Sequence, residues 1–542
     1  MIHAIALRDL FPAGSLFLDC WEGSSRFRSL VPRWFRDPGA FAEQRDALVG
    51  RAYDRKAVAS ILQEQNLLFG AGSAVMANIQ RLADPRSLVV IGGQQAGLFG
   101  GPLYTVHKAL TILSLAERME SHLGQPVIPV FWIASEDSDL AEVDKAVVAD
   151  SDGRLRELRL AGDETAKVPV SLVKLGSGLP PLLDELAEVL PQTEFASDIL
   201  ESLRLSYSPE KAYPQAFGAW MAALFSGRGL VIIDPSDVRL KRIAMPLFQK
   251  EVAGKSPVSR AVIEQTKLLS GAGYAPQIEL REGMLTLFHQ APAREAIAIQ
   301  DRGFTLRSAG RAFSNGDLEA LLAEKPEQFT PNAVLRPLYQ DSLFPTLAVV
   351  LGPSEIAYFC QLPLAYQGMN IPMPVIFPRS SLTLVEPRVQ RLLSKFDLSL
   401  AAVLSRGERI IDDIVRKGIP PALLDQLSSG REQAVGTWDS LSQSIHRLDP
   451  TLDRTAQIAA GRTLRQFEFM EKKILQAARR KEETLRAQTR RLAAALAPRG
   501  GLQERTLTAL PFLARYGRPV LGQAAAAIDP FAPEHRGVVI DG

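Results

Sequence analysis

A glycine-rich segment is the part of the sequence whose composition most clearly indicates ligand binding. It reads Gly92-Gly-Gln-Gln-Ala-Gly-Leu-Phe-Gly-Gly101, follows an apolar run and precedes a helical pattern. Five glycines in ten residues let a ligand approach the backbone closely, and N–H groups at a helix start attract anions. A tight turn between strand and helix is the structural alternative. The candidate binding residues here are Gly93, Gln94, Gln95, Gly97 and Thr105.

The segment matches neither of two common phosphate-binding motifs. A Walker A loop requires Lys and then Ser or Thr after its second glycine, whereas Leu98 and Phe99 follow Gly97. The GxGxxG pattern of dinucleotide-binding proteins is also missing. A nucleotide or carboxylate bound at this loop must therefore be held in another way.

His107 and Lys108 follow the loop in the first turns of the expected helix, and both can stabilise negative charge. Class I aminoacyl-tRNA synthetases and related nucleotidyltransferases place a histidine motif after their first strand, where the imidazole acts on the α-phosphate of ATP. Only one histidine of that motif is present here, and Lys395 is a weak counterpart of the KMSKS lysine. A structural role for His107 is the alternative.

Three carboxylates, Glu136, Asp137 and Asp139, crowd the end of a second apolar run. Like charges this close repel each other, so they favour a cation: an ammonium group, Mg²⁺ or a basic side chain. Asp137 and Asp139 would face the same ligand if the strand continued through them. A solvated acidic turn is the alternative.

A third cluster of polar residues flanks a later apolar run. Glu355 and Tyr358 are three residues apart on an expected helix and can share one face. Ordinary helix capping would explain the neighbouring Ser354. The candidate binding residues of this cluster are Arg336, Gln340, Asp341, Glu355 and Tyr358.

Short, unalternating apolar runs indicate strands that are buried on both faces, as in a parallel sheet. The spacing of apolar residues predicts a helix over 103–123 that ends at Gly124. Strand, helix and strand then form a βαβ unit, and the ligand crevice lies at the carboxyl ends of the strands. The predicted strands are Leu88–Ile91, Val127–Ala134, Leu230–Ile233, Leu347–Leu351 and Pro374–Phe377.

The fold class predicted for residues 1–395 is therefore α/β, with a Rossmann-like parallel core. Alternating patterns near 145–175 and 276–307 predict antiparallel ribbons, which we assign to an insertion at roughly 150–330. The strand at 230–233 belongs either to the core or to this insertion.

Residues 396–542 are predicted to form an α-helical domain. Residues 451–497 contain no proline and fit a heptad with Leu464, Leu485 and Leu492 at a positions and Phe467 at a d position. Such a helix of about 70 Å needs a partner. The partner is either the 423–448 segment, in a hairpin, or a second copy in a homodimer. The basic run at 462–491 is either a solvated face or an anion site.

Composition excludes several classes of protein. The chain has 542 residues and a net charge of +2, so no overall field attracts nucleic acid. No apolar run reaches the ~18–20 residues of a membrane span. Two cysteines indicate a reducing compartment, and we expect the cytoplasm. Six scattered histidines and the lack of CxxC or HExxH motifs give no reason to expect a resident metal.

Several longer motifs resemble the cysteine ligase family of bacillithiol biosynthesis (BshC). They are 92–108, Pro129-Val-Phe-Trp-Ile-Ala-Ser-Glu-Asp137, Arg336-Pro-Leu-Tyr-Gln-Asp341, Gly352-Pro-Ser-Glu-Ile-Ala-Tyr358 and Leu502-Gln-Glu-Arg505. The resemblance implies a Rossmann-like core related to class I synthetases, connecting insertions and a C-terminal coiled coil that dimerises. It also implies addition of L-cysteine to glucosaminyl-malate. The family usually has histidine where this chain has Ser138.

The implied reaction requires activation of a carboxylate, because an amine does not displace oxide. We expect ATP, with Mg²⁺ at most accompanying the nucleotide. His107 and Lys108 would then stabilise phosphate charge, while Asp137 and Asp139 hold the cysteine ammonium group. Another ATP-dependent ligase or nucleotidyltransferase on the same scaffold, or an inactive coiled-coil scaffold, are the alternative functions.

Overall fold

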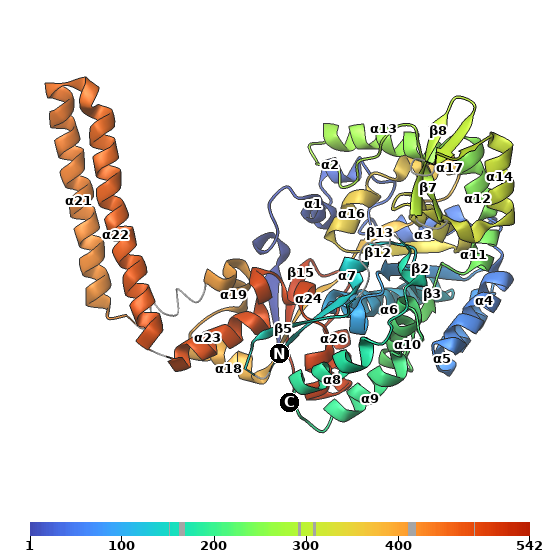
Figure 1. Cartoon of the computed structure of the whole chain (residues 1–542), viewed down its shortest axis with the longest axis horizontal. Coiled ribbons are helices and arrows are strands. Elements are labelled where there is room, and N and C mark those ends of the chain that lie inside the picture. Colours follow the sequence, from blue (N-terminus) through green and yellow to red (C-terminus); the bar gives the residue numbers. More distant parts are fainter. Residues whose placement is uncertain are drawn as a thin grey trace. The chain divides into compact units, whose positions relative to one another are not determined.

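The computed structural model describes residues 1–150, 152–161, 168–290, 294–306, 310–409, 419–481 and 483–541, except for the side chains of 408, 478–481 and 483–486. The chain folds into two compact units (Figure 1). Unit 1 comprises Met1–Ser151, Leu155–Leu384 and Gln503–Gly542, and unit 2 comprises Asp152–Arg154 and Val385–Leu502. The expected boundary at residue 395 therefore differs in two respects: unit 1 ends at Leu384, and the chain returns to it after Leu502.

A five-stranded parallel sheet forms the centre of unit 1, as the apolar runs predicted. Its strands are β2 (Leu88–Gln94), β3 (Val127–Ile133), β6 (Val231–Ile233), β12 (Thr346–Leu351) and β13 (Val375–Pro378). They lie in the order β13-β12-β2-β3-β6, with every pairing parallel. Numbered along the chain, this is the 3-2-1-4-5 order of a doubly wound Rossmann sheet, whose direction of winding reverses between β2 and β12.

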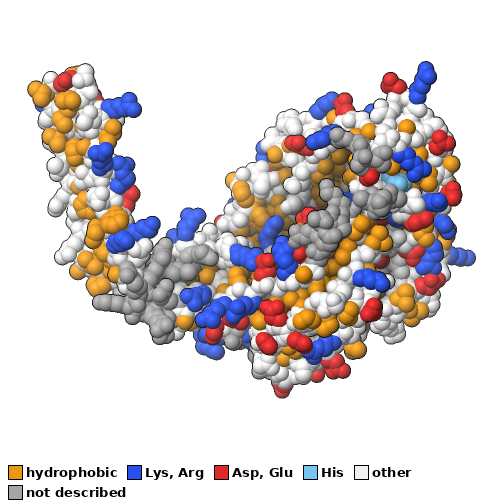
Figure 2. All heavy atoms as spheres, in the orientation of Figure 1, with side chains coloured by type: hydrophobic (Ala, Val, Ile, Leu, Met, Phe, Trp, Pro, Cys, Tyr) orange, Lys and Arg blue, Asp and Glu red, His pale blue; other side chains and the backbone are white. Residues whose placement is uncertain are grey.

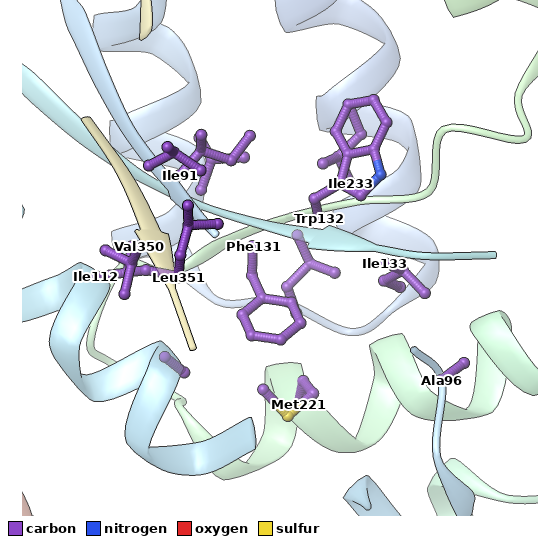
Figure 3. Close-up of a cluster of buried hydrophobic side chains, with 14 of the residues drawn as sticks. Ile91, Ala96, Ile112, Phe131, Trp132, Ile133, Met221, Ile233, Val350 and Leu351 are labelled. Atoms are coloured by element: carbon purple, nitrogen blue, oxygen red, sulfur yellow. The ribbon is translucent and has the colours of Figure 1, made fainter. Parts of the chain in front are cut away.

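Helices cover both faces of this sheet. Phe131 and Trp132 point to opposite faces of β3, and both are fully buried (Figure 3). On the Phe131 face lie α6 (Leu103–Leu123), which ends at Gly124 in the left-handed conformation, and α10 (Tyr213–Leu224). Apolar side chains on every strand therefore pack against helices, which explains why the runs show no alternation. The helices before β2 that pack against the sheet strands include α3 (Ala40–Leu48), α4 (Arg55–Leu68) and α5 (Ser73–Leu82).

The expected insertion at 150–330 is not one separate piece, because β6 within it is an edge strand of the central sheet. The two predicted antiparallel regions are present. β4 (Lys145–Ala149) pairs with β5 (Leu155–Arg159). A second sheet, in the order β10-β9-β8-β7-β11, contains β7 (Met284–Gln290), β8 (Arg294–Gln300), β9 (Gly303–Leu306), β10 (Ala312–Phe313) and β11 (Phe329–Pro331).

The two ends of the chain meet in a third sheet. β1 (Ile2–Ala6) pairs antiparallel with β15 (Glu534–Val539), which neighbours β14 (Ser381–Val385). The prediction of an α-helical domain over 396–542 is therefore wrong for its last segment, which forms β15. The other helices of unit 1 are α1 (Leu16–Glu22), α2 (Ser25–Arg28), α7 (Leu140–Val143), α8 (Leu179–Val189), α9 (Ala196–Ser206), α11 (Val238–Ile243), α12 (Met245–Ala253), α13 (Pro257–Gly271), α14 (Asn315–Glu324), α15 (Leu335–Leu343), α16 (Pro353–Phe359), α17 (Pro363–Met369), α24 (Gln503–Thr506), α25 (Leu510–Tyr516) and α26 (Pro519–Ala526).

Unit 2 is helical and contains a long hairpin. α21 (Pro421–Leu448) and α22 (Asp453–Lys481) run side by side (Figure 1). Phe467, at a predicted d position, faces Gly430 of α21, so the predicted apolar seam is used within the chain. The predicted helix over 451–497 corresponds to α22 and to α23 (Glu483–Leu496); residue 482 between them lies outside the described residues, as does the Leu485 side chain. The other α-helices described in this unit are α18 (Pro387–Lys395), α19 (Leu400–Arg406) and α23, and Leu492 on α23 is fully buried.

Among the described residues, no helix combines the length and hydrophobicity that crossing a lipid bilayer requires.

Candidate active site

A cavity of about 910 Å³ lies at the carboxyl ends of the parallel strands of unit 1. Its volume falls in the upper part of the ~300–1,000 Å³ range of small-molecule sites. Its walls carry charges of both signs, with cations in excess. The positively charged lining residues are Lys108, Lys145, Arg294, Arg336, Arg379 and Arg505, and the negatively charged ones are Glu136, Asp137, Glu142 and Glu355.

Glycine at the end of β2 allows the strands to converge at this edge. A Cβ atom at Gly92 would lie 2.9 Å from the Val350 carbonyl oxygen of β12, and one at Gly93 would lie 2.8 Å from the Trp132 carbonyl oxygen of β3. Larger residues at either position would push neighbouring strands apart. Both glycines therefore allow close packing of the strands, and Gly93 also lines the crevice. Part of the glycine content thus has a structural reason, although this reason is strand packing and not the tight turn considered above.

Lys108 connects the two strand ends on either side of the point where the sheet reverses its winding. Its Nζ donates to the Gly93 carbonyl oxygen at 2.6 Å, to Gln94 Oε1 at 3.0 Å and to Glu355 Oε2 at 2.6 Å. The side chain is 1% exposed, and burial lowers the pKa of its ammonium group, although Glu355 opposes this effect. All three N–H donors are used, so Lys108 offers the cavity its charge more than a free hydrogen bond.

Arg336 is the second cation close to this point. It donates to Gln340 Oε1 at 3.3 Å and to the Tyr358 hydroxyl at 2.9 Å. A guanidinium carries five N–H donors, so further donors remain for a ligand. Behind Arg336, Asp341 accepts hydrogen bonds from Gln340 and Thr346 inside the core, where burial raises the pKa of its carboxyl group to about 6.

Glu136 and Asp137 follow β3 and occupy different environments. One oxygen of Glu136, Oε1, lies 2.7 Å from Lys241 Nζ, and its side chain is 8% exposed. Burial raises the pKa of this carboxyl group, although Lys241 opposes the effect. Asp137 is 45% exposed and accepts hydrogen bonds from Gln95 Nε2 at 3.0 Å and from the Ser138 backbone N–H at 2.7 Å.

His107 lies outside the cavity lining. Its Nδ1 is 2.9 Å from Glu504 Oε2, and the imidazole is fully buried. Burial lowers the pKa of His107. Burial would raise the pKa of Glu504, but Arg379 at 2.6 Å and His107 hold it well below its usual range. Glu504 thereby holds Arg379, which does line the cavity.

The structure brings together most, but not all, of the residues predicted for the site. Those that line the cavity are Gly93, Gln94, Gln95, Lys108, Glu136, Asp137, Arg336, Glu355 and Tyr358. Those that do not are Gly97, Thr105, His107, Asp139, Gln340 and Asp341. Asp139 is exposed and precedes α7, because β3 ends at Ile133 and the expected continuation of the strand is absent. Gly97 packs against Gly101, where a Cβ would lie 2.8 Å from its Cα.

Comparison with known proteins identifies the family. The profile described as "Bacillithiol biosynthesis BshC, N-terminal Rossmann-like domain" matches residues 3–380, and that of the "C-terminal coiled-coil domain" matches 382–540. The chain belongs to the BshC family. Relatives named "Putative cysteine ligase BshC" include proteins of Salinibacter ruber (34% identical, 96% of this chain and 95% of the relative), Koribacter versatilis (35%, 89% of each) and Geobacillus kaustophilus (31%, 92% and 93%).

One position departs from what the resemblance to BshC proteins led us to expect. Ser138 occupies the place of the usual histidine, and its hydroxyl accepts a hydrogen bond from Arg294 at 3.4 Å. Arg294 also donates to the Pro331 carbonyl oxygen at 3.2 Å and stacks 4.1 Å above the Phe288 ring centroid. In this BshC chain, position 138 therefore helps to place a cavity cation.

Four cations of the BshC cavity were not among the predicted site residues: Lys145, Arg294, Arg379 and Arg505. Arg379 follows the predicted strand at 374–377, and Arg505 belongs to a motif that resembles the family, so both carried a sequence signal. Arg294 and Lys145 lie on antiparallel ribbons, where nothing in the local sequence distinguishes a cavity residue from a surface residue. Among the described residues, no cluster of three His, Cys, Asp or Glu side chains is placed to hold a metal ion.

Proposed function

We propose that this BshC chain is a cysteine ligase, which forms an amide between the carboxyl group of L-cysteine and the amino group of glucosaminyl-malate. The names of its relatives and the family profile, which covers most of the chain, support this activity. The observation that carries the proposal is the cavity at the reversal point of the Rossmann sheet, lined by six cations and four carboxylates. Such a lining suits a zwitterionic amino acid together with polyanionic co-substrates.

ATP is the proposed activating co-substrate, and the cavity residues fit its charge. Lys108, Arg336, Arg379 and Arg505 all lie among the lining residues. The first three follow or adjoin β2, β12 and β13, where a Rossmann sheet binds nucleotides. Phosphate transfer or adenylation would turn the cysteine carboxylate into an acyl group that an amine can attack. Any Mg²⁺ would arrive with the nucleotide.

Asp137 is the proposed contact for the cysteine ammonium group. Of the two carboxylates after β3 that line the cavity, it is the more exposed, and its side chain stays 45% exposed despite its hydrogen bonds. The Gln95 side chain holds Asp137 by a hydrogen bond, which connects the segment after β3 to the loop after β2. The amino acid would thus lie between the acidic end of β3 and the cationic ends of β2 and β12.

The experiment that tests this function measures thiols in cells that lack the gene. Loss of bacillithiol with accumulation of glucosaminyl-malate, both reversed by the wild-type gene, is the expected result. An unchanged thiol pool would contradict the proposal and favour either a different ATP-dependent ligase or nucleotidyltransferase, or an inactive coiled-coil scaffold. Purified protein supplied with ATP, cysteine and glucosaminyl-malate should release AMP or ADP together with product.

A homodimer through unit 2 and a cytoplasmic location belong to the same proposal. The helical hairpin keeps apolar residues partly exposed on both helices (Figure 2), which favours a second copy as partner. These residues are Leu423, Val435, Leu441, Ile458, Phe469 and Met470. Cys20 and Cys360 are both free and buried, as suits a reducing compartment.

A further inference from the structure

We propose that Glu136 is the general base of the transfer step, which takes a proton from the ammonium group of the acceptor through its Oε2 atom. The inference rests on the proposed ligase function and deepens it. An amine attacks a carbonyl only when its nitrogen carries a lone pair, so a protonated sugar amine must first lose a proton. A carboxylate that lines the cavity beside the bound amine can accept that proton.

Glu136 is the cavity carboxylate whose surroundings suit this task. Glu355 is bound to Lys108 and to the Gly352 backbone N–H. Asp137 is held by Gln95 and Ser138 and is the more exposed group. Glu136 is nearly buried, borders the cavity, and is fixed through Oε1 by Lys241. The ion pair with Lys241 uses Oε1, and none of the described residues donates a hydrogen bond to Oε2.

Lys241 is a positioning residue in this arrangement. Its Nζ also donates to the Phe329 carbonyl oxygen at 2.8 Å, so the ammonium is anchored from β11 and holds Glu136 in one orientation. The other charged or titratable groups that act on Glu136 are Asp234 after β6, Arg294 on β8 and Tyr339 on α15. Burial is the largest influence and raises the pKa of Glu136, which brings a base nearer to working pH.

Topology separates the two halves of the reaction. Glu136 follows β3, whereas Lys108 and Glu355 lie at the β2 and β12 ends, where the phosphates are proposed to bind. The acceptor amine would therefore approach the activated carboxyl group from the β3 side. The nitrogen forms the C–N bond, and the C–O bond to the phosphate group breaks, with the electron pair leaving on AMP or phosphate. The first ammonium proton goes to Glu136, and the second passes to the leaving phosphate oxygen or to water.

A trapping experiment separates transfer from activation. Hydroxylamine is uncharged at neutral pH and attacks an activated carboxyl group without a base, giving cysteine hydroxamate. The variant Glu136→Gln keeps the size of the side chain and an oxygen for Lys241. We expect it to form hydroxamate at the wild-type rate with ATP and cysteine, while transfer to glucosaminyl-malate falls about 100-fold or more. Glu64→Gln, on the surface of α4 (side chain 56% exposed), is the matched control and should change neither rate.

The pH profile supplies a second readout that a merely structural role would not move. Wild-type transfer should rise with pH as Glu136 loses its proton, and Glu136→Gln should shift this rise to the higher pH at which the free amine forms. Wild-type protein that forms no hydroxamate would overturn the proposed ligase function. Hydroxamate formation by both proteins, with equal transfer rates and equal pH profiles, would overturn the base assignment alone.

Discussion

Lys108 and Glu355, 247 residues apart in sequence, are joined by a 2.6 Å contact between Nζ and Oε2 across the point where the sheet reverses its winding. Glu355 uses the same Oε2 atom to accept the Gly352 backbone N–H at 2.7 Å, which caps the start of α16. A single carboxylate oxygen thus connects α6, the end of β12 and the first turn of α16. The pair fixes the geometry of the crevice from both sides.

Replacing Lys108 by Met should lower both stability and activity. The change leaves the Gly93 carbonyl oxygen, Gln94 and Glu355 without their donor. Removal of one partner from a buried pair costs about 3–5 kcal/mol, and we expect about 2–3 kcal/mol here because the Glu355 side chain is 26% exposed. Urea unfolding measures the loss. The double variant Lys108→Met/Glu355→Gln should lose less than the sum of the single variants, and strict additivity would show that the pair is not coupled.

Replacing Asp137 by Asn should mainly weaken cysteine binding. The change removes the negative charge that the ammonium group is proposed to contact. Gln95 and the Ser138 N–H donate to different oxygens of Asp137, so the single amide oxygen of Asn keeps one of these hydrogen bonds. Loss of a ground-state contact raises KM and leaves kcat nearly unchanged. Steady-state kinetics with varied cysteine test this expectation. A reduced kcat at unchanged KM would place the ammonium group elsewhere.

Replacing His107 by Ala distinguishes a structural role from a role in charge stabilisation. The buried imidazole contacts Glu504, which holds Arg379, so we expect a stability loss of about 2–4 kcal/mol. Turnover should fall only modestly, through displacement of Arg379. Thermal unfolding and turnover should be measured on the same preparation. Full stability together with a 10²–10³-fold loss of turnover would instead match a donor that acts in the transition state.

The different fates of His107 and Lys108 show what local sequence can and cannot predict. Apolar runs identified all five parallel strands, because burial on both faces leaves a signal within each strand. The glycine loop and Glu355 were found because they follow strand ends. The orientation of His107, however, depends on Glu504, which is 397 residues away, and neighbouring residues carry no trace of it. Arg294 reaches the cavity only because of the way its antiparallel ribbon packs. No periodic pattern in the local sequence predicts that packing.

The imidazole of His535 should make the protein acid-sensitive. It lies between the Ser381 and Thr383 hydroxyls, each 2.8 Å from a ring nitrogen, and burial lowers its pKa from 6.5 to about 4. A base with a lowered pKa in the folded state contributes stability that is complete above pH 6.5 and is lost as pH falls toward 4. The loss over this window is about 3 kcal/mol.

Unfolding free energies at several pH values between 7 and 4 measure this effect. His535→Gln cannot gain a proton, so its stability should fall less steeply over the window, although it starts from a lower value at pH 7. Identical slopes for the variant and the wild-type protein would assign the acid sensitivity to other groups.

The hairpin of unit 2 provides the test of the proposed homodimer. Leu492 is unsuitable for this purpose, because it is fully buried within the unit and its replacement would disturb folding. Ile458 and Phe469 on α22 are each 49% exposed, so the hairpin leaves both side chains partly uncovered. The double variant Ile458→Asp/Phe469→Asp places charge on the surface that a second copy would bury, so the dimer should dissociate at micromolar concentration. Sedimentation velocity measures the change, with Arg462→Asp, an exposed polar position on α22, as the control that stays dimeric. A wild-type protein that sediments as a monomer would show that the hairpin alone satisfies the apolar seam.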